Sequence, residues 1–212
     1  MDASWDSYNR SSNGSLVPDP TLWPSGIDHT VSYVHGLDMG FGLCKRSSAL
    51  CRPPHAPSAS RLTVRLHARS DGDRGTLDCA RHPGAQGHEA QDGAWFGAHK
   101  IDWYKEDACY ATGEQSTALA QYGKMRDALN ASGYQVWFAL CGWENFYAPH
   151  GKTLANSART GPDTGTGWTA VMKNIENALP VQQYAGPTAN GGYWNDGASR
   201  ETPRIHPLNL RS

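Results

Sequence analysis

The residues best suited to chemistry stand in the stretch His99–Tyr110, which reads HKIDWYKEDACY. Successive side chains of a β-strand point to opposite faces, so Ile101, Lys105 and Asp107 would share one face if this stretch is a strand. An ammonium group and a carboxylate then lie side by side at the carboxyl end of the strand. The lysine would stabilise the charge that an aspartate needs in order to act as a nucleophile. Taken alone, the same pattern is also typical of a solvated strand end with a surface ion pair.

A second pair of candidate residues, Arg159 and Asp163, stands four positions apart after Asn156 and Ser157. Taken alone, this pair is typical of an ion pair in a loop. In a site, Arg159 could orient a hydroxyl group or the carboxylate of Asp163.

A metal site is a weaker interpretation of the nearby His82, His88 and Glu89. The H-E-x-x-H and C-x-x-C spacings that are typical of zinc sites are absent from the sequence. We therefore expect no metal and no cofactor.

The elements that would position these residues alternate along the chain. Apolar residues at helical spacing predict helices, and short apolar runs bounded by turn residues predict strands. The predicted helices cover residues 23–35, 90–98, 115–131 and 168–178, and the predicted strands cover 39–43, 101–107, 134–140, a short stretch near 159, and 181–184. Residues 10–24 read as a long loop. This alternation predicts an α/β fold with a parallel sheet.

Several motifs occur in an order that resembles the α-galactosidase/α-N-acetylgalactosaminidase family of retaining glycoside hydrolases. They are Gly75–Cys79, Pro83-Gly84, Gly87–Glu89, Tyr104–Cys109, Phe138–Trp143, Asn156–Asp163, Ala185–Pro187 and Gly191–Asp196. The likeness covers residues 2–43 and 72–196. It implies a (β/α)8 TIM barrel, of which residues 1–196 would supply roughly units 2 to 7.

The resemblance also implies roles for the two aspartates. Asp107 falls on the nucleophile of the family and Asp163 on its general acid/base. A retaining glycosidase holds two such carboxyl groups about 5–5.5 Å apart. The family's tryptophan before the arginine is Ala158 here, which would leave that wall of the site open.

Further residues would contact the sugar on the same grounds. They are Asp2, Trp5, Lys105, Cys141, Gly142, Trp143, Arg159 and Asp196. Many relatives carry glutamate where this chain has Gly142, so the space at the sugar's 2-position is open to a hydroxyl or an acetamido group. Cys141 is better explained as a buried thiol than as a ligand. Cys79 and Cys109 match a disulfide of the family.

The stretch 45–71 departs from this pattern. It carries six lysines and arginines against one aspartate, and it shows no sustained periodicity. We interpret it as an aberrant basic insertion that comes from a retained intron; a long surface loop or a basic nucleic-acid-binding arm would be alternatives. Cys44 stands where the family has a tyrosine. Residues 197–212 resemble no part of the family.

Met1 and Asp2 resemble the end of a barrel strand more than the start of a protein, and we expect units one and eight to be absent. Because this would leave open sheet edges, we expect the 212-residue chain itself to be inactive. The expected function of the parent protein is release of terminal α-D-galactose. The alternatives are an α-N-acetylgalactosaminidase and a non-catalytic sugar-binding homologue.

Composition limits the partners. The formal net charge of −1 gives no reason to expect a nucleic-acid partner. The sequence contains no run of 18 apolar residues, so we expect no membrane-spanning helix. We expect an α-galactoside carbohydrate as the partner, and oligomers remain open. The chain shows no signal peptide, but three sequons at Asn9, Asn13 and Asn130 fit a secreted or vacuolar/lysosomal parent protein.

Overall fold

A computed structural model describes residues 5–45, 77–78, 81–108, 114–141, 145–162, 167–189 and 191–196. The chain divides into two compact units, Met1–Cys141 and Gly142–Ser212, which are described separately.

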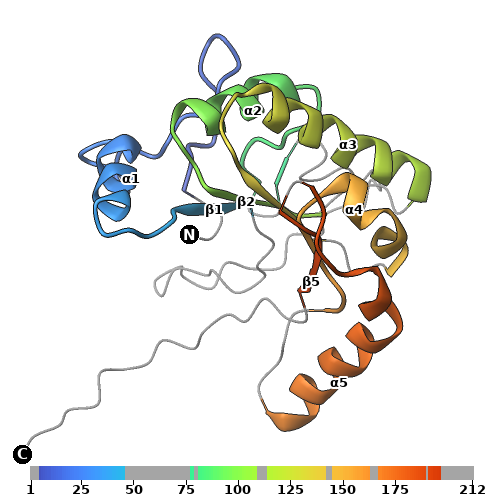
Figure 1. Cartoon of the computed structure of the whole chain (residues 1–212). Helices are drawn as coiled ribbons and strands as arrows, with labels where there is room; N and C mark the ends of the chain where they lie inside the picture. The colour runs from blue at the N-terminus through green and yellow to red at the C-terminus, as the bar shows by residue number, and fades with distance from the viewer. Residues whose placement is uncertain are drawn as a thin grey trace, which may run out of the picture. The chain divides into compact units, whose positions relative to one another are not determined.

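The described residues of the first unit form three parallel strands and three helices (Figure 1). In chain order these are α1 (Ile27–His35), β1 (Gly42–Lys45), α2 (Glu89–Ala98), β2 (Trp103–Glu106), α3 (Gln115–Ala131) and β3 (Trp137–Leu140). The strands are neighbours in sequence order, with Gly42 opposite Trp103 and Trp103 opposite Trp137. Helices α2 and α3 lie together on one side of these strands.

Helix α3 forms where the sequence predicts it. Its apolar positions Ala118, Tyr122, Met125 and Leu129 recur every three or four residues and are buried. The side chain of Glu114 caps its amino end by accepting hydrogen bonds from Thr117 and Ser116, and these bonds lower the pKa of Glu114 to about 2. The periodicity and the cap together fix both the face and the start of the helix.

Aromatic rings show which face of β2 the helices cover. The ring of Tyr104 lies 4.1 Å from that of Phe96 in α2 and 5.9 Å from that of Phe138 in β3. Phe138 in turn lies 6.3 Å from Tyr122 of α3. Tyr104 therefore points toward the helices, and its strand neighbours Trp103 and Lys105 point to the opposite face.

Helices α2 and α3 approach each other closely because α2 carries glycine at the contact. A Cβ atom added at Gly93 would lie 2.5 Å from the carbonyl carbon of Ala128, and one at Gly97 would lie 2.5 Å from the Cβ of Ser132. Any larger side chain at either position would force the helices apart.

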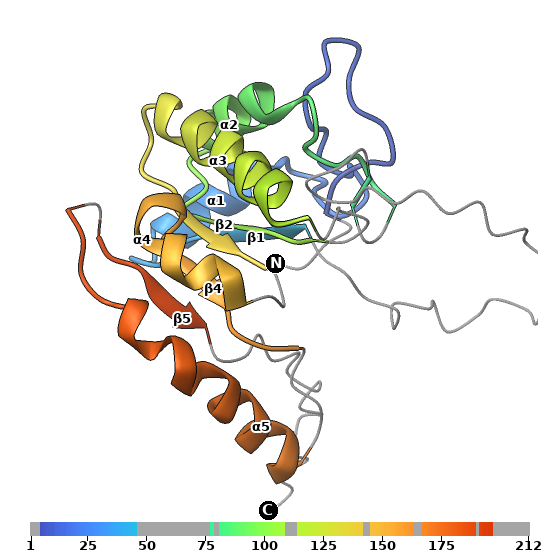
Figure 2. The ribbon, with the colours of Figure 1, turned by 90° about the vertical axis from the view of Figure 1, so that its right-hand side faces the viewer.

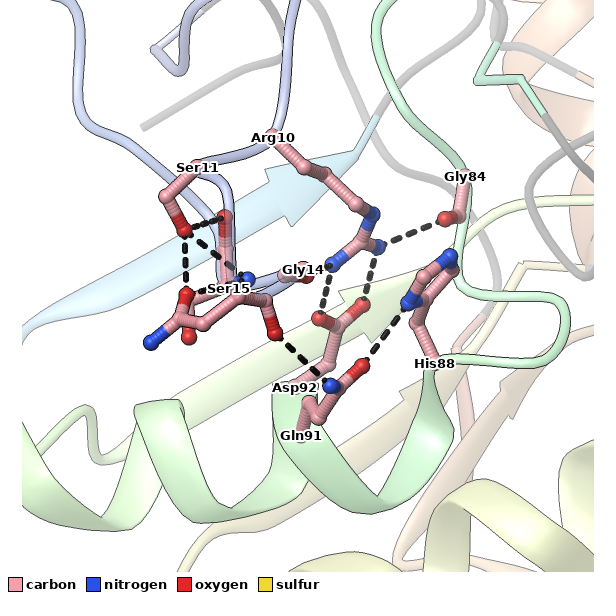
Figure 3. A network of polar contacts seen from close by, with 9 residues as sticks. Arg10, Ser11, Gly14, Ser15, Gly84, His88, Gln91 and Asp92 are labelled. Carbon is pink, nitrogen blue, oxygen red and sulfur yellow. Dashed lines mark hydrogen bonds and ion pairs between the residues drawn. The ribbon is translucent and has the colours of Figure 1, made fainter.

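The long loop that precedes α1 is fastened to α2 by a buried ion pair (Figure 3). Both terminal nitrogens of Arg10 bind the carboxylate of Asp92, at 2.5 and 2.7 Å, and they also donate to the carbonyls of Gly14 and Gly84. Gln91 adds a hydrogen bond to the carbonyl of Asn13 at 2.9 Å. The loop has no helix or strand between residues 7 and 26, so these contacts and its own turns determine its course.

The part of the second unit that the structure describes has two parallel strands, β4 (Ser157–Arg159) and β5 (Trp194–Asp196), with Ser157 opposite Trp194 (Figure 2). Its helical elements are η1 (Asn145–His150), α4 (Gly151–Leu154), α5 (Trp168–Ala178) and η2 (Leu179–Tyr184). Gly151 is required at the start of α4, because a Cβ there would lie 2.2 Å from the ring of Tyr193.

Most predicted elements are confirmed, with shifted ends. Helices 115–131 and 168–178 have the predicted limits, whereas the helix predicted over 23–35 begins at Ile27 and the strand predicted over 39–43 runs from Gly42 to Lys45. The strand predicted over 181–184 is wrong, because these residues belong to the 3₁₀ helix η2. Pro180 explains the difference, since it cannot donate to a sheet and favours the first turn of a helix. The strand lies at 194–196 instead, and η1 and α4 were not predicted.

Candidate active site

Asp107 lies directly after the carboxyl end of β2. Its side chain is buried, with 1% of its surface exposed, and Oδ1 accepts a hydrogen bond of 2.7 Å from the backbone N–H of Ala108. A surface ion pair at a solvated strand end would be exposed, so that interpretation is wrong for Asp107. A buried carboxylate at the carboxyl end of a parallel strand has the position that active-site residues of α/β barrels share.

Lys105 is also buried, with 6% of its surface exposed. It lies opposite Cys44 of β1 and Ala139 of β3, on the face of the strands that α2 and α3 do not cover. Asp107 follows two residues after Lys105, directly beyond the last residue of β2. Both the ammonium group of Lys105 and the carboxylate of Asp107 are thus buried at the same end of this strand.

Cys141 and Trp5 are likewise buried in the first unit. Cys141 has no exposed surface, and its backbone N–H donates to the carbonyl of Glu106 at 2.8 Å. These facts agree with a buried thiol. The ring of Trp5 is fully buried and stacks on Trp95 at 5.2 Å, so its environment is that of a core residue. Direct contact of either side chain with a sugar stays a prediction.

In the second unit, Arg159 and Asp196 are paired across the two parallel strands, at the carboxyl ends of β4 and β5. Arg159 is buried, and its Nε donates to the carbonyl of Gly161 at 3.1 Å. Asp196 is partly exposed, and its carbonyl accepts the backbone N–H of Thr160 at 3.1 Å. The structure therefore brings together two of the predicted sugar-binding residues.

Six of the predicted residues lie outside the described part of the chain. They are Asp2, Asp163, Gly142, Trp143, Cys79 and Cys109. Their roles, including the disulfide, stay predictions. The stretch 45–71 also lies outside it, apart from the backbone of Lys45 in β1.

Two buried ionisable groups of the first unit were not singled out from the sequence for these roles. Glu106 has 1% of its surface exposed, and it shares the parity of Tyr104 and so points to the helix-covered side of β2. His82, considered above only as a metal ligand, has Asp6 beside its ring. Only the parity of β2 gave a signal for Glu106, and no local pattern gave one for the pairing of Asp6 with His82.

Among the residues that the structure describes, no group of three or more His, Cys, Asp or Glu side chains is arranged to hold a metal ion. Within the same ranges, none of the helices is both long enough and apolar enough to cross a bilayer.

Parallel strands that alternate with helices, and that carry buried charged residues at their carboxyl ends, define an α/β fold of the barrel type. The comparisons with known proteins agree. The family profile described as "Alpha galactosidase A" matches residues 61–200. The chain therefore belongs to the α-galactosidase family.

Individual relatives give the same result. A "probable alpha-galactosidase" of Dictyostelium discoideum is 31% identical over 188 residues, and "Alpha-galactosidase 3" of Arabidopsis thaliana is 30% identical over 197 residues. These alignments cover 88% and 92% of this chain, but only 41% and 38% of the relatives. The solved α-galactosidase of Saccharomyces cerevisiae superimposes with a TM-score of 0.74 at 26% identity, over 93% of this chain and 42% of that one. The chain thus spans about 40% of the length of these relatives, and the barrel-type fold is confirmed.

Proposed function

We propose that the protein carrying this chain is a retaining α-galactosidase in which Asp107 is the nucleophile and Asp163 the general acid/base. The observation that carries the proposal is the burial of both Lys105 and Asp107 at the carboxyl end of β2, in a chain of the α-galactosidase family. The alternation of β2 supports it further, because Tyr104 packs on the helices and leaves Lys105 on the other face.

The reaction needs two carboxyl groups in opposite protonation states. The Asp107 carboxylate attacks the anomeric carbon while Asp163 donates its proton to the departing glycosidic oxygen, which leaves a glycosyl ester on Asp107. Asp163, now ionised, takes a proton from water, and the resulting hydroxide displaces Asp107 and restores both groups. Two inversions give net retention. Lys105 would stabilise the negative charge of Asp107 in the free enzyme and as the ester breaks.

The sugar's 2-position decides between two activities. Gly142 leaves room where many relatives have a glutamate, and this observation favours α-N-acetylgalactosamine as a second candidate substrate. One structure of the S. cerevisiae α-galactosidase is described with raffinose, so raffinose is a suitable natural galactoside to test. The carbohydrate-contact roles of Asp2, Trp143, Arg159 and Asp196 belong to the same proposal.

Covalent labelling tests the nucleophile. The longest protein that the gene encodes, called here the gene product, is incubated with a galactose-configured cyclophellitol epoxide and analysed by peptide mass spectrometry. We expect one label, on Asp107, and none in Asp107→Asn. Glu106→Gln is the matched control, because Glu106 is the neighbouring carboxylate on the helix-covered face, and this variant should still be labelled.

A label on another residue, or labelling that persists in Asp107→Asn, would overturn the assignment. Turnover of p-nitrophenyl α-galactoside, its 2-acetamido analogue and raffinose by the same protein then decides the substrate. Faster turnover of the acetamido sugar would favour the second candidate.

A further inference from the structure

Three buried side chains meet beside the segment 6–8, which follows Trp5. None of the three has a role assigned above. His82 has 3% of its surface exposed, Asp6 has 1%, and Asp78 has none. Nδ1 of His82 lies 3.3 Å from Oδ1 of Asp6. Burial of an ionisable ring between two carboxylates is costly unless the ring carries the compensating charge.

The backbone holds His82 firmly on its own side of this cluster. Its N–H donates to Oδ1 of Asp78 at 2.8 Å, and its carbonyl accepts the N–H of Asp78 at 2.7 Å. Leu77 and Pro83 pair as an isolated antiparallel bridge around the same turn. The imidazole therefore keeps its position whether or not it carries a proton.

The opposite side of the cluster is the segment 6–8. Its backbone is bonded to the following loop through Ser7 N–H and the carbonyl of Val17 at 2.7 Å, and its side chains reach the imidazole. The ring of exposed Tyr8 packs on His82 with the centroids 4.2 Å apart, where a protonated ring gains a cation–π contribution. Asp6 reaches His82 through its carboxylate. Asp19 supplies a third carboxylate. Its pKa is lowered mainly by hydrogen bonds from Thr21 and, to a smaller extent, by the positive charge of His82.

We propose that His82, Asp6 and Asp78 form an acid-stabilised clamp, which holds segment 6–8 against residues 77–78 and 81–83 in acidic solution and releases it in alkaline solution. The charged groups close to the imidazole are Asp6 and Asp19 from the amino-terminal loop and Asp78 from the same turn as His82, so the described surroundings of the ring are acidic. The neighbouring Arg81 is exposed.

The direction of the pH dependence follows from these charges. The close contact with the Asp6 carboxylate, 3.3 Å away, and the negative charges of Asp6 and Asp78 raise the pKa of His82 above its ordinary value of 6.5, although burial opposes them. A histidine with a raised pKa in the folded state contributes stability that is fully present below 6.5 and is lost as the pH rises through the raised value. Above that value two buried carboxylates face an uncharged ring.

The opening should be local, because a second attachment of the same loop does not depend on a histidine. Arg10 binds Asp92 and the carbonyl of Gly84, only two residues after His82, and guanidinium keeps its charge throughout this pH range. The loop would stay fastened at Arg10. The chain would also stay fastened at Trp5, whose carbonyl accepts the N–H of Asp19 at 2.9 Å and the indole N–H of Trp23 at 2.8 Å, while segment 6–8 loosens.

The test uses the gene product and two measurements. NMR titration of the His82 ring, assigned by triple-resonance experiments on the wild type, should give a midpoint above 6.5, and Asp6→Asn should lower that midpoint. Hydrogen exchange should show protection of Ser7, whose N–H donates to the carbonyl of Val17, falling across the same pH range in the wild type, whereas protection of Asp78, whose N–H donates within the fixed turn, should stay constant. His82→Gln should lose this pH dependence.

His88→Gln is the matched control. His88 lies six residues further on and its Nδ1 contacts the neutral side chain of Gln91 at 2.8 Å, so this variant should keep the wild-type pH dependence. The proposal is overturned by a His82 midpoint at or below 6.5, by an unchanged midpoint in Asp6→Asn, or by loss of the pH dependence in His88→Gln. If His82→Gln does not fold, the wild type, Asp6→Asn and His88→Gln still decide the question.

Discussion

The ion pair between Arg10 and Asp92 gives the sharpest stability prediction. In Arg10→Met the loop keeps a side chain of similar length but loses the two bonds to Asp92 and the bonds to the carbonyls of Gly14 and Gly84. Asp92 has 1% of its surface exposed, so its carboxylate would remain buried without this cation. Removal of one partner from a buried pair typically costs about 3–5 kcal/mol of unfolding free energy.

Urea unfolding of the gene product, followed by tryptophan fluorescence, measures this cost, because Trp95 lies in α2 next to the pair and stacks on Trp5. Arg126→Met is the matched control: its ion pair with Asp127 is exposed, and such pairs contribute about 0–1 kcal/mol. Arg10→Lys should fall between the two, since lysine cannot make the bidentate contact. If Arg10→Met costs no more than Arg126→Met, the conclusion that this pair fastens the loop is refuted.

Two further predictions concern the packing of the first unit. Gly93→Ala should destabilise the gene product by about 1–3 kcal/mol through overpacking against Ala128. Gly123→Ala, where the nearest atom is 3.8 Å from the added Cβ, should instead stabilise it by about 0.5–1 kcal/mol. The urea midpoints of the two variants measure these effects, and equal midpoints would contradict the close approach of α2 and α3. Burial favours the protonated form of Asp102, but hydrogen bonds from Phe41, Tyr134 and His35 outweigh it and hold the pKa of Asp102 below 3.8. Its contribution is therefore present above 3.8 and lost as the pH falls through the lowered value, so the stability of Asp102→Asn should depend less on pH than that of the wild type below about pH 4.

Local patterns predicted the helices best. In α3 the apolar period from Ala118 to Leu129 and the Glu114 cap agree with each other, and the predicted ends are those observed. The stretch 181–184 failed because Val181 and Tyr184 suit a strand as well as a helix, and only Pro180 argues for a helical turn. A short apolar run does not carry enough information to separate the two.

The buried polar residues likewise fall into those that a local sequence pattern can place and those that it cannot. Alternation along β2 was sufficient to place Lys105 on the face away from the helices, because strand parity is a local property. The environments of Arg10 and His82 depend on partners 82 and 76 positions away, Asp92 and Asp6, and no spacing rule relates residues that far apart. Their burial could be learned only from the tertiary structure.

Asp102, at the amino end of β2, has a consequence for how such chains can be recombined. Its carboxylate accepts the N–H of Phe41, just before β1, at 2.6 Å and the hydroxyl of Tyr134, just before β3, at 2.7 Å. Its backbone carbonyl also accepts the N–H of Trp137 at 2.7 Å. One residue thus connects the starts of three successive strands by hydrogen bonds, at the end of the strands opposite to Asp107. Exchange of βα units with a relative should succeed when the crossovers leave residues 41–137 from one parent, and crossovers inside that range should give chimeras whose strands lose their common reference point.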